Sequence, residues 1–380
     1  MKKRIFWCFQ QLHNVGGTEV VTLHIIRLIS NEYEIHIVPF SPVDKSKIIY
    51  KIPDNVIIED IGFPDEVSQF DLNFANKIKE KHYLKALNFL FKTIYLYTFG
   101  RYKYKRKLSN LTTKKDVIII ASSELMLFAP KKRHVVQHFH YNSYLYNNSF
   151  TKLLRLISRK PDEFVFLTKA TQEVLKNKIH TPSTFILNPC RFNRELHLDY
   201  NNNTLITVAR LEAQKDPMLL LKIAKELDNR HFKYTYNIYG NGSFKEKMLD
   251  YIKENNLKNV HVIQGITELA PYYAKSDLYI MGSKFEGIGL TCIEANSLSV
   301  PLIWVDVGDP TSSFIIEGQN GYIVHSRDPK EFADKIIETL SDKDKLIALK
   351  KSAFETSKRF DENEIKKNWE TFLDKTFNSL

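Results

Sequence analysis

The stretch Phe285-Glu286-Gly287-Ile288-Gly289-Leu290-Thr291-Cys292-Ile293-Glu294-Ala295 decides how the second half of the chain folds. Residues 277–281 before it predict a buried strand, and Leu290, Ile293 and Leu298 predict the inward face of a helix. A glycine-containing turn joins the two. Free backbone N–H groups point out of such a turn, and the helix dipole adds partial positive charge. We therefore expect an anion pocket at this strand end.

Two carboxylates, Glu286 and Glu294, flank the turn. They would repel a bare phosphate, but carboxylate oxygens accept hydrogen bonds from the hydroxyls of a polyol. Acidic side chains beside a phosphate pocket therefore favour a phosphorylated ligand that also carries a sugar, such as a nucleotide sugar.

Length and composition indicate two globular domains. The chain has 380 residues, 43% of them hydrophobic, and single domains usually have about 100–200 residues. The apolar run after Met1-Lys2-Lys3-Arg4 is too short for a signal peptide, and lysines interrupt residues 84–99, the best candidate for a membrane span. The cysteines lie far apart and predict neither a disulfide framework nor a metal cluster. We expect a cytoplasmic protein.

Strand and helix patterns alternate in both halves of the chain, which is typical of parallel sheets in α/β domains. We predict one Rossmann-like domain over 1–185 and a second over 186–360, with a helix over 361–380 that packs back on the first. The favoured fold class is two doubly wound domains facing across a ligand-binding cleft. The predicted strands are 4–9, 32–39, 56–61, 116–121, 134–139, 163–167, 204–208, 234–239, 260–264, 277–281 and 301–305, followed by a tail of helices.

A basic segment rich in aromatic residues spans 77–107, in a chain whose formal net charge is +11. Such a segment suits an anionic membrane surface, at about 1 kcal/mol per basic residue near the lipid. A solvated helix face and a nucleic-acid surface are the alternatives. Because no nucleic-acid motif accompanies the segment, we expect no nucleic-acid partner and favour peripheral attachment to the inner face of the cell membrane.

Two cations follow the first strand of the second half. Arg210 offers a planar fork for phosphate oxygens, and Lys215 offers a mobile point charge. A surface salt bridge would explain the pair alone, but we expect it at the same sheet edge as Glu286. Two glycine turns also follow strands, at Gly16-Gly17 and at Gly240-Asn241-Gly242, where backbone can approach a ligand closely.

Two histidines, His138 and His140, end the strand at 134–139 and point to the same side by strand alternation. A metal site would need a third ligand, which the neighbouring sequence lacks, so a polar contact from one histidine to substrate is the favoured interpretation. We expect no metal and no cofactor other than a nucleotide-sugar substrate.

Together these segments resemble the family 4 retaining glycosyltransferases, the glycosyl transferases group 1 proteins of the GT-B fold. The resemblance covers nearly the whole chain and is densest over 205–324. The segments that carry it are 286–294, which matches the family's E-x7-E element, 209–216, which matches its arginine–lysine clamp, 16–19, which matches its amino-terminal glycine loop, and 239–242 and 317–322.

The resemblance implies a role for each candidate residue. Glu286 would contact hydroxyls of the donor sugar, and Glu294 would contact the ribose. Arg210 and Lys215 would neutralise the diphosphate as it leaves. Backbone N–H groups of Gly287, Ile288, Gly289 and Leu290 would bind the phosphates, and Gly16, Gly17 and Gly240 would approach the same ligand.

His140 is the best match to the family's active-site histidine, and His138 is the fallback. Backbone contacts near Ile266 would select the base, with a UDP-sugar favoured over a GDP-sugar.

Two features depart from the pattern. Ser299-Val300-Pro301 lacks the glycine that usually precedes this proline, and the amino-terminal half matches only at its loops.

The resemblance thus implies a metal-independent, retaining hexosyltransferase. Its acceptor would be a glycan or a lipid-linked molecule in bacterial lipopolysaccharide or capsule synthesis. One alternative is a non-catalytic GT-B protein that partners other glycosyltransferases at a membrane. A nicotinamide dehydrogenase is a second alternative, but the three-glycine dinucleotide fingerprint is missing.

Overall fold

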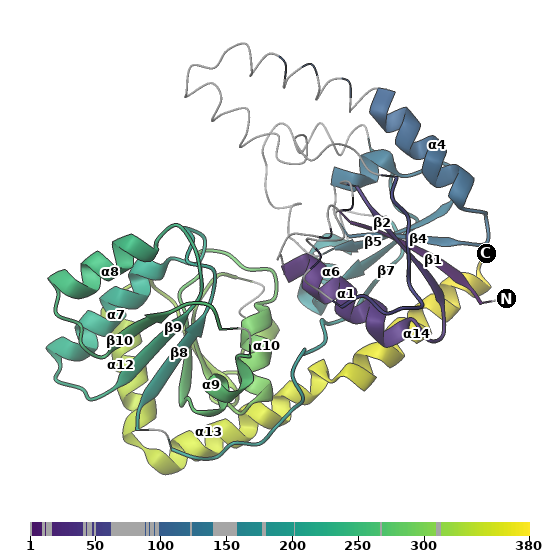
Figure 1. The fold of residues 1–380 in the computed structure, drawn as a ribbon. Coiled ribbons are helices and arrows are strands. Elements are labelled where there is room, and N and C mark those ends of the chain that lie inside the picture. The colour runs from purple at the N-terminus through teal and green to yellow at the C-terminus, as the bar shows by residue number, and fades with distance from the viewer. Residues whose placement is uncertain are drawn as a thin grey trace. The chain divides into compact units, whose positions relative to one another are not determined.

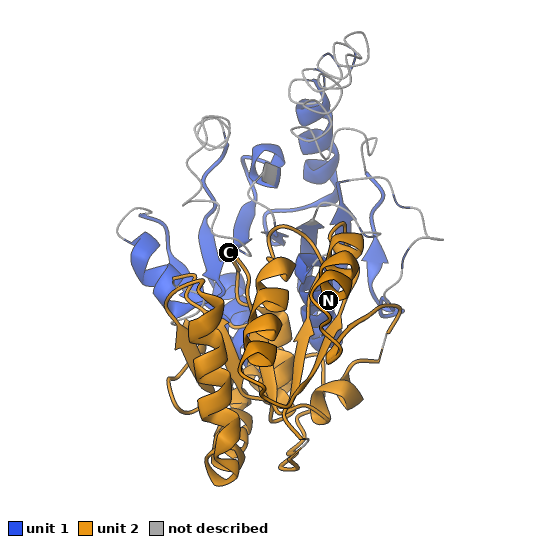
Figure 2. Cartoon of the chain, turned by 90° about the vertical axis from the view of Figure 1, so that its left-hand side faces the viewer, with its two compact units in different colours: residues 1–186, 366–380 blue, residues 187–365 orange. Residues whose placement is uncertain are grey.

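The computed structural model describes residues 2–9, 12, 17–40, 43, 48, 51–61, 88, 91, 95, 99–121, 124–139, 158–176, 180–200, 202–266, 268–308 and 313–380. The chain forms two compact units (Figure 2). Unit 1 contains residues 1–186 and 366–380, and unit 2 contains residues 187–365. The sequence analysis places the boundary between the two domains at 185/186, and it predicts that a helix over 361–380 packs back on the first domain.

Unit 1 is built on a parallel sheet with the strand order β3-β2-β1-β4-β5-β6-β7. Its strands are β1 (Arg4–Phe9), β2 (Glu34–Pro39), β3 (Ile57–Ile58), β4 (Val117–Ile120), β5 (His134–Phe139), β6 (Glu163–Phe166) and β7 (Ser183–Phe185). All four residues of β4 are buried apolar side chains, as expected for a central parallel strand that is covered on both faces.

The helices of unit 1 are α1 (Gly17–Ile29), α4 (Arg101–Leu111), the 3-10 helix η4 (Glu124–Phe128), α6 (Lys169–Lys176) and the later part of α14 (Glu362–Asn378). From α14, Trp369 packs on Trp7 of β1 with ring centroids 5.2 Å apart. This contact places the C-terminal residues of the chain in the core of unit 1.

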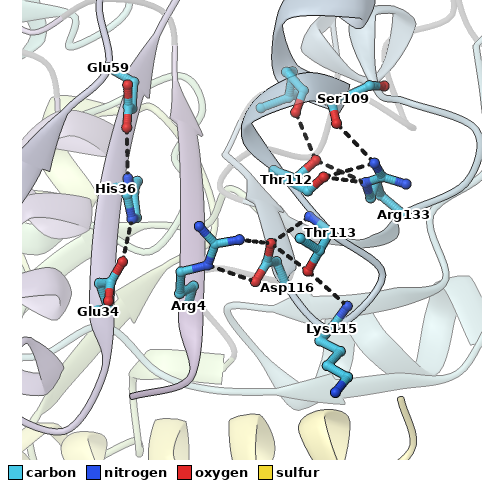
Figure 3. Close-up of polar contacts among 11 residues, drawn as sticks. Arg4, Glu34, His36, Glu59, Ser109, Thr112, Thr113, Lys115, Asp116 and Arg133 are labelled. Atoms are coloured by element: carbon cyan, nitrogen blue, oxygen red, sulfur yellow. Dashed lines mark hydrogen bonds and ion pairs between the residues drawn. The ribbon is translucent and has the colours of Figure 1, made fainter. Parts of the chain in front are cut away.

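Polar contacts link the strands of unit 1 to each other and to their loops (Figure 3). Arg4 on β1 donates two hydrogen bonds to Asp116, just before β4, at 3.0 and 2.6 Å. On β2, His36 lies between Glu34 and Glu59, with ring nitrogen to carboxylate distances of 3.0 and 2.8 Å. These contacts fasten edge strand β3 and central strand β4 to their neighbours.

Unit 2 is built on a second parallel sheet with the order β10-β9-β8-β11-β12-β13. Its strands are β8 (Thr204–Val208), β9 (Thr235–Tyr239), β10 (Val260–Ile263), β11 (Leu278–Met281), β12 (Leu302–Val305) and β13 (Gly321–Val324). Its helices are α7 (Pro217–Asn229), α8 (Lys245–Glu254), α9 (Ala270–Ala274), α10 (Leu290–Ser297), α12 (Pro329–Ser341), α13 (Lys343–Thr356) and the 3-10 helix η5 (Ser357–Phe360).

Helices cover both faces of the unit 2 sheet (Figure 1). Helices α7, α8 and α12 lie on one face, and α10 lies on the other, where it packs against α13.

A fully buried ion pair, Lys350 Nζ to Asp277 Oδ1 at 3.1 Å, joins α13 to the start of β11. Burial lowers the pKa of Lys350, and Asp277 opposes that shift. Breaking such a pair is expected to cost about 3–5 kcal/mol, because it leaves a buried charge uncompensated.

The predicted fold class is confirmed, since both units are parallel α/β sheets. The predicted strands agree with the observed ones to within one or two residues at most ends, except that only Ile57–Ile58 of 56–61 is strand. Two strands were missed, β7 and β13. The prediction of helices alone after 305 is therefore wrong. Strand β13 contains Gly321 and only three apolar residues, too short a pattern to distinguish from a loop.

Only part of the basic-aromatic segment 77–107 falls within the described residues, namely 88, 91, 95 and 99–107. Among the described residues, no helix is both long and apolar enough to cross a membrane.

Candidate active site at the edge of the unit 2 sheet

Strands β8 and β11 lie side by side at the centre of the unit 2 sheet. The chain continues from β8 outward to β9 and β10, and then returns to β11 on the other side of β8. This is the topological switch point of a doubly wound sheet, where the loops diverge and ligands bind. The loop after β8 carries Arg210 and Lys215, and the loop after β11 carries Glu286. Tertiary structure thus brings three predicted residues to one sheet edge.

Lys215 and Glu286 form an ion pair between Nζ and Oε1. Two hydrogen bonds that involve Gln214 join the loops that carry them. Lys284 N donates to Gln214 O at 2.8 Å, and Gln214 Nε2 donates to Phe285 O at 3.1 Å. The lysine side chain is 16% exposed and the glutamate side chain 6%. A ligand that binds either group must therefore displace this ion pair or share it.

Arg210 is exposed at the same edge, and its Nη2 lies 3.2 Å from Gln214 Oε1. Gln214 therefore orients the predicted cation while its backbone carbonyl and side-chain amide hold the opposite loop. Arg210 is placed to receive an anion that arrives from solvent, whereas Lys215 lies deeper, against Glu286.

The turn into α10 depends on Gly289. This residue has φ +63°, and a Cβ on it would lie 3.1 Å from the Trp304 ring and 3.2 Å from Cys292 Sγ. Glycine meets both demands, because it adopts left-handed backbone without steric cost and has no side chain. Tyr279 Oη lies 2.7 Å from Thr291 Oγ1 and donates to Val208 O at 2.9 Å, which fastens the first turn of α10 to β8.

Glu294 lies inside α10 and its carboxylate is held by two side chains. Arg191 Nε lies 2.6 Å from Glu294 Oε1, and Tyr273 Oη donates to Glu294 Oε2 at 3.0 Å. Burial raises the pKa of Glu294, and Arg191 and Tyr273 work against that shift. The predicted ribose-binding carboxylate is therefore part of a buried network.

Gly240 and Gly242 are required by packing against the neighbouring loop. A Cβ on Gly240 would lie 1.8 Å from Ala209 O, and one on Gly242 would lie 2.4 Å from Leu211 O. Ala209 N and Leu211 N donate hydrogen bonds to Tyr239 O and Asn241 O at 3.0 and 2.8 Å. The two glycines thus let the β9 loop support the loop that carries Arg210. Contact of Gly240 with a ligand stays a prediction.

The unit 1 candidates are described only in part. Gly17 is exposed at the first residue of α1, whereas Gly16 and His140 lie outside the described residues. His138 is buried, with its ring 5.0 Å from the Trp369 ring and 6.1 Å from the Trp7 ring. The fallback histidine is therefore a core residue in unit 1, where its ring packs between β1 and α14.

Two further positions in unit 2 have clear environments. Ile266 is half-buried on the loop after edge strand β10, beside Gly265, which has φ +75°. Ser299 stands where the family has glycine and adopts φ +65°. Its hydroxyl accepts from His197 N at 2.9 Å and donates to Glu195 O at 3.1 Å. These bonds hold the turn in a conformation that glycine adopts more readily.

Sequence reasoning missed Gln214, Arg191, Tyr273 and Arg327. Arg327 donates to Asp216 Oδ2 at 2.7 Å and also to carbonyl oxygens at the end of β11, which secures the residue next to Lys215. None of these four residues stands in a recognisable motif except Gln214. Apart from Arg210–Gln214, the contacts join positions far apart in the chain, so no local pattern signals them.

Comparison with known proteins agrees with this geometry. The family model for glycosyl transferases group 1 matches residues 191–365, which lie within unit 2. A UDP-N-acetylglucosamine–peptide N-acetylglucosaminyltransferase GtfA subunit of Streptococcus agalactiae is 29% identical over 182 residues, 46% of this chain and 36% of that protein. An uncharacterized glycosyltransferase of Haemophilus influenzae is 21% identical over 369 residues, 91% of this chain and 95% of that protein.

Among solved structures, a mutant of S. aureus TarM in complex with Fondaparinux, alpha-GlcNAc-glycerol and UDP has a TM-score of 0.74 at 16% identity. The match covers 97% of this chain and 99% of that one. The chain therefore has the GT-B fold, and its second unit matches a glycosyl transferases group 1 domain. The chain spans only 34–44% of the length of the GtfA relatives that it matches.

Proposed function

We propose that this protein is a metal-independent, retaining glycosyltransferase that transfers a sugar from a UDP-sugar to a glycan or lipid-linked acceptor at the bacterial cell surface. The observation that carries the proposal is the meeting of Lys215 with Glu286 at the switch point, beside the glycine turn into α10. A phosphate-binding cation and a hydroxyl-binding carboxylate in contact suit a ligand in which a diphosphate is bonded directly to a sugar.

The proposed mechanism rests on electrostatic stabilisation of the leaving group. Negative charge builds on the diphosphate as the glycosidic bond breaks, and Lys215, Arg210 and the backbone N–H groups at the start of α10 neutralise it. Fixed donors of this kind lower the barrier because they need no reorganisation during the reaction. Glu286 holds the sugar hydroxyls and is not a nucleophile. The departing phosphate oxygen accepts the proton of the acceptor hydroxyl, and the acceptor oxygen bonds to the anomeric carbon on the face that the phosphate leaves, so the configuration is retained.

The names of the similar proteins guide the choice of donor and acceptor. The GtfA relatives are named for UDP-N-acetylglucosamine and a peptide, and the TarM structure contains UDP with alpha-GlcNAc-glycerol. We take UDP-N-acetylglucosamine as the first donor to test. The acceptor panel includes lipid-linked glycan, lipopolysaccharide and capsule fragments, peptide, and a glycerol or ribitol polymer.

The test is titration of the purified protein with UDP- and GDP-sugars, followed by donor hydrolysis and transfer assays. Lys215→Ala and Glu286→Gln should each lower turnover about a hundredfold or more. Lys222→Ala removes an exposed lysine from α7 and serves as the matched control with wild-type turnover. Failure to bind any nucleotide sugar would refute the proposal. Donor binding with turnover equal to that of Arg210→Ala would favour the non-catalytic partner instead.

Attachment to an anionic membrane is a separate part of the proposal, supported by the surface of α4. Phe99, just before α4, and Tyr102 on α4 are 72% and 68% exposed, near the exposed cations Lys103, Arg106 and Lys107. Burial lowers the pKa of Lys105 to about 8, helped by its positive neighbours Arg101, Lys131 and Arg159. Exposed aromatic rings beside concentrated positive charge suit a lipid surface with negative headgroups.

Liposomes test this attachment. The protein should sediment with vesicles that contain anionic lipid at low salt and be released at high salt, because salt screens exposed charges. Replacement of Lys103, Arg106 and Lys107 by glutamine should weaken sedimentation while nucleotide binding stays unchanged. Equal sedimentation of this variant and the wild type would count against α4 as the contact surface.

A further inference from the structure

The carboxylate of Glu294 is held by side chains from two other parts of unit 2. Arg191 precedes the unit 2 sheet and reaches both oxygens, with Nε 2.6 Å from Oε1 and Nη2 3.4 Å from Oε2. Tyr273 on α9 donates its hydroxyl to Oε2 at 3.0 Å. Two donors that approach from separate elements determine the position and the plane of the carboxylate.

Phe192 packs against both donors. The guanidinium of Arg191 lies 4.6 Å from the centre of the Phe192 ring, and the Tyr273 ring meets the same ring edge-on at 6.0 Å. Tyr273 is fully buried, and the Glu294 side chain is only 7% exposed. A planar guanidinium that stacks on a ring is pre-organised, so it loses little conformational freedom when it also bonds a carboxylate. Contacts with Phe192 and Glu294 thus hold both donors, although the Arg191 side chain is 38% exposed.

The carboxylate retains acceptor capacity. An ionised carboxylate has about four acceptor positions. Its contacts among the described residues occupy one on Oε1 and two on Oε2. One position on Oε1 is therefore not occupied by any described residue, and the same two side chains orient it.

We propose that Arg191 and Tyr273 are positioning residues that aim the Glu294 carboxylate at the ribose hydroxyls of the nucleotide. This inference rests on the proposed function, because it requires a nucleotide donor whose ribose meets Glu294. Neither residue touches the reacting atoms. Their effect is to make the site prefer a ribonucleotide over a nucleotide that lacks the 2′-hydroxyl.

The charges around Glu294 support this arrangement. Burial raises the pKa of Glu294, and Arg191 and Tyr273 both lower it toward its usual range. The other titratable groups that interact with it are Cys190 and Cys292, whose pKa values burial raises, so both thiols stay neutral. Arg191 thus places positive charge beside the buried carboxylate and favours its ionised form, which accepts hydrogen bonds.

The competing explanation is structural, since the same network fastens residues 190–192 to α10. The two explanations differ in their effect on nucleotide selectivity. A purely structural bond would change the affinities for UDP and 2′-deoxy-UDP by the same factor. A positioning role changes the affinity for UDP alone.

The experiment is calorimetric titration of the full chain with UDP and with 2′-deoxy-UDP, without acceptor. The wild type should bind UDP about tenfold or more tightly than 2′-deoxy-UDP, the usual value of a hydrogen bond to a charged group. Arg191→Gln should bring this ratio to within about twofold of unity, with 2′-deoxy-UDP affinity nearly unchanged, and Arg191→Lys should recover part of it. In a Glu294→Gln background, Arg191→Gln should change the ratio no further.

Tyr273→Phe removes only one hydroxyl, and it tests the positioning role if Arg191→Gln does not fold. It should lower the ratio several-fold while the thermal unfolding midpoint shows that the protein is folded. An unchanged ratio in Tyr273→Phe and in folded Arg191→Gln would overturn the inference, as would a wild type that binds both nucleotides equally. A wild type that binds neither nucleotide would refute the proposed function itself.

Discussion

Glu286 and Glu294 come from one short stretch of sequence, yet the tertiary structure gives them different surroundings. Glu286 stands on the loop after β11, and its charged partner among the described residues is Lys215, on the loop after β8. Glu294 stands inside α10 and is held by Arg191 and by Tyr273 on α9. The first carboxylate is paired with a flexible lysine side chain, and the second is held by a stacked arginine fork and a buried tyrosine.

This difference teaches which contact can change when a ligand binds. A lysine is a point charge on a flexible stem and moves from one anion to another at little cost, whereas a stacked arginine fork is restricted to one geometry. We infer that Lys215 leaves or shares Glu286 when a diphosphate arrives, while Arg191 stays on Glu294. The contacts around Glu286 then change when the ligand binds, whereas the contacts around Glu294 stay as they are.

The sharpest test of this comparison is the opposite effect of two substitutions on the affinity for UDP alone. Glu286→Gln and Lys215→Met should both lower sugar transfer about a hundredfold or more. With UDP alone, Lys215→Met should weaken binding about tenfold, because a charged hydrogen bond to phosphate is lost. Glu286→Gln should instead strengthen UDP binding several-fold, since it frees the lysine. Calorimetric titration measures both affinities, and weaker UDP binding by Glu286→Gln would show that the pair does not compete with the diphosphate.

The glycine between the two carboxylates gives the next largest effect. Gly289→Ala forces a side chain into left-handed backbone and against Trp304 and Cys292, so it should lower the free energy of unfolding by about 2–3 kcal/mol. Gly265→Ala meets open space at φ +75° and should cost only the backbone strain, about 1–2 kcal/mol. Chemical denaturation compares the two variants. Equal losses would mean that the packing at Gly289 adapts around the new methyl group.

The smallest expected effect is the pH dependence of nucleotide binding. Because burial raises the pKa of Glu294, its carboxyl takes up a proton at a higher pH than an ordinary glutamate does. Binding that uses the ionised carboxylate is therefore complete above that pKa and should weaken, up to about tenfold, as the pH falls through it. Glu294→Gln should remove this acidic limb, and Glu286→Gln should leave it in place. Titrations of UDP between pH 5 and 8 would check both, and an acidic limb that persists in Glu294→Gln would assign it to another group.

Much of unit 2 was predictable from local pattern. The strands at 204–208 and 278–281 were found because short apolar runs ended at polar loops, and Gly289 stood where a strand turns into a helix. Strand β13 was missed because one of its four residues is glycine. Gly240 was predicted as a ligand-contacting turn, but what the structure makes evident is its close packing on Ala209.

The candidate site was likewise predictable only in part. Glu286, Glu294, Arg210 and Lys215 were recognised by residue type and spacing, which are properties of the sequence alone. The sequence predicts that Arg210 and Lys215 lie at the same sheet edge as Glu286, but it does not predict the ion pairs, because Lys215–Glu286 and Arg191–Glu294 join residues that are distant in the chain. A sequence pattern reports local conformation and side-chain chemistry. The tertiary structure alone decided which cation neutralises which carboxylate, because strand order and burial determine which charges lie close enough to interact.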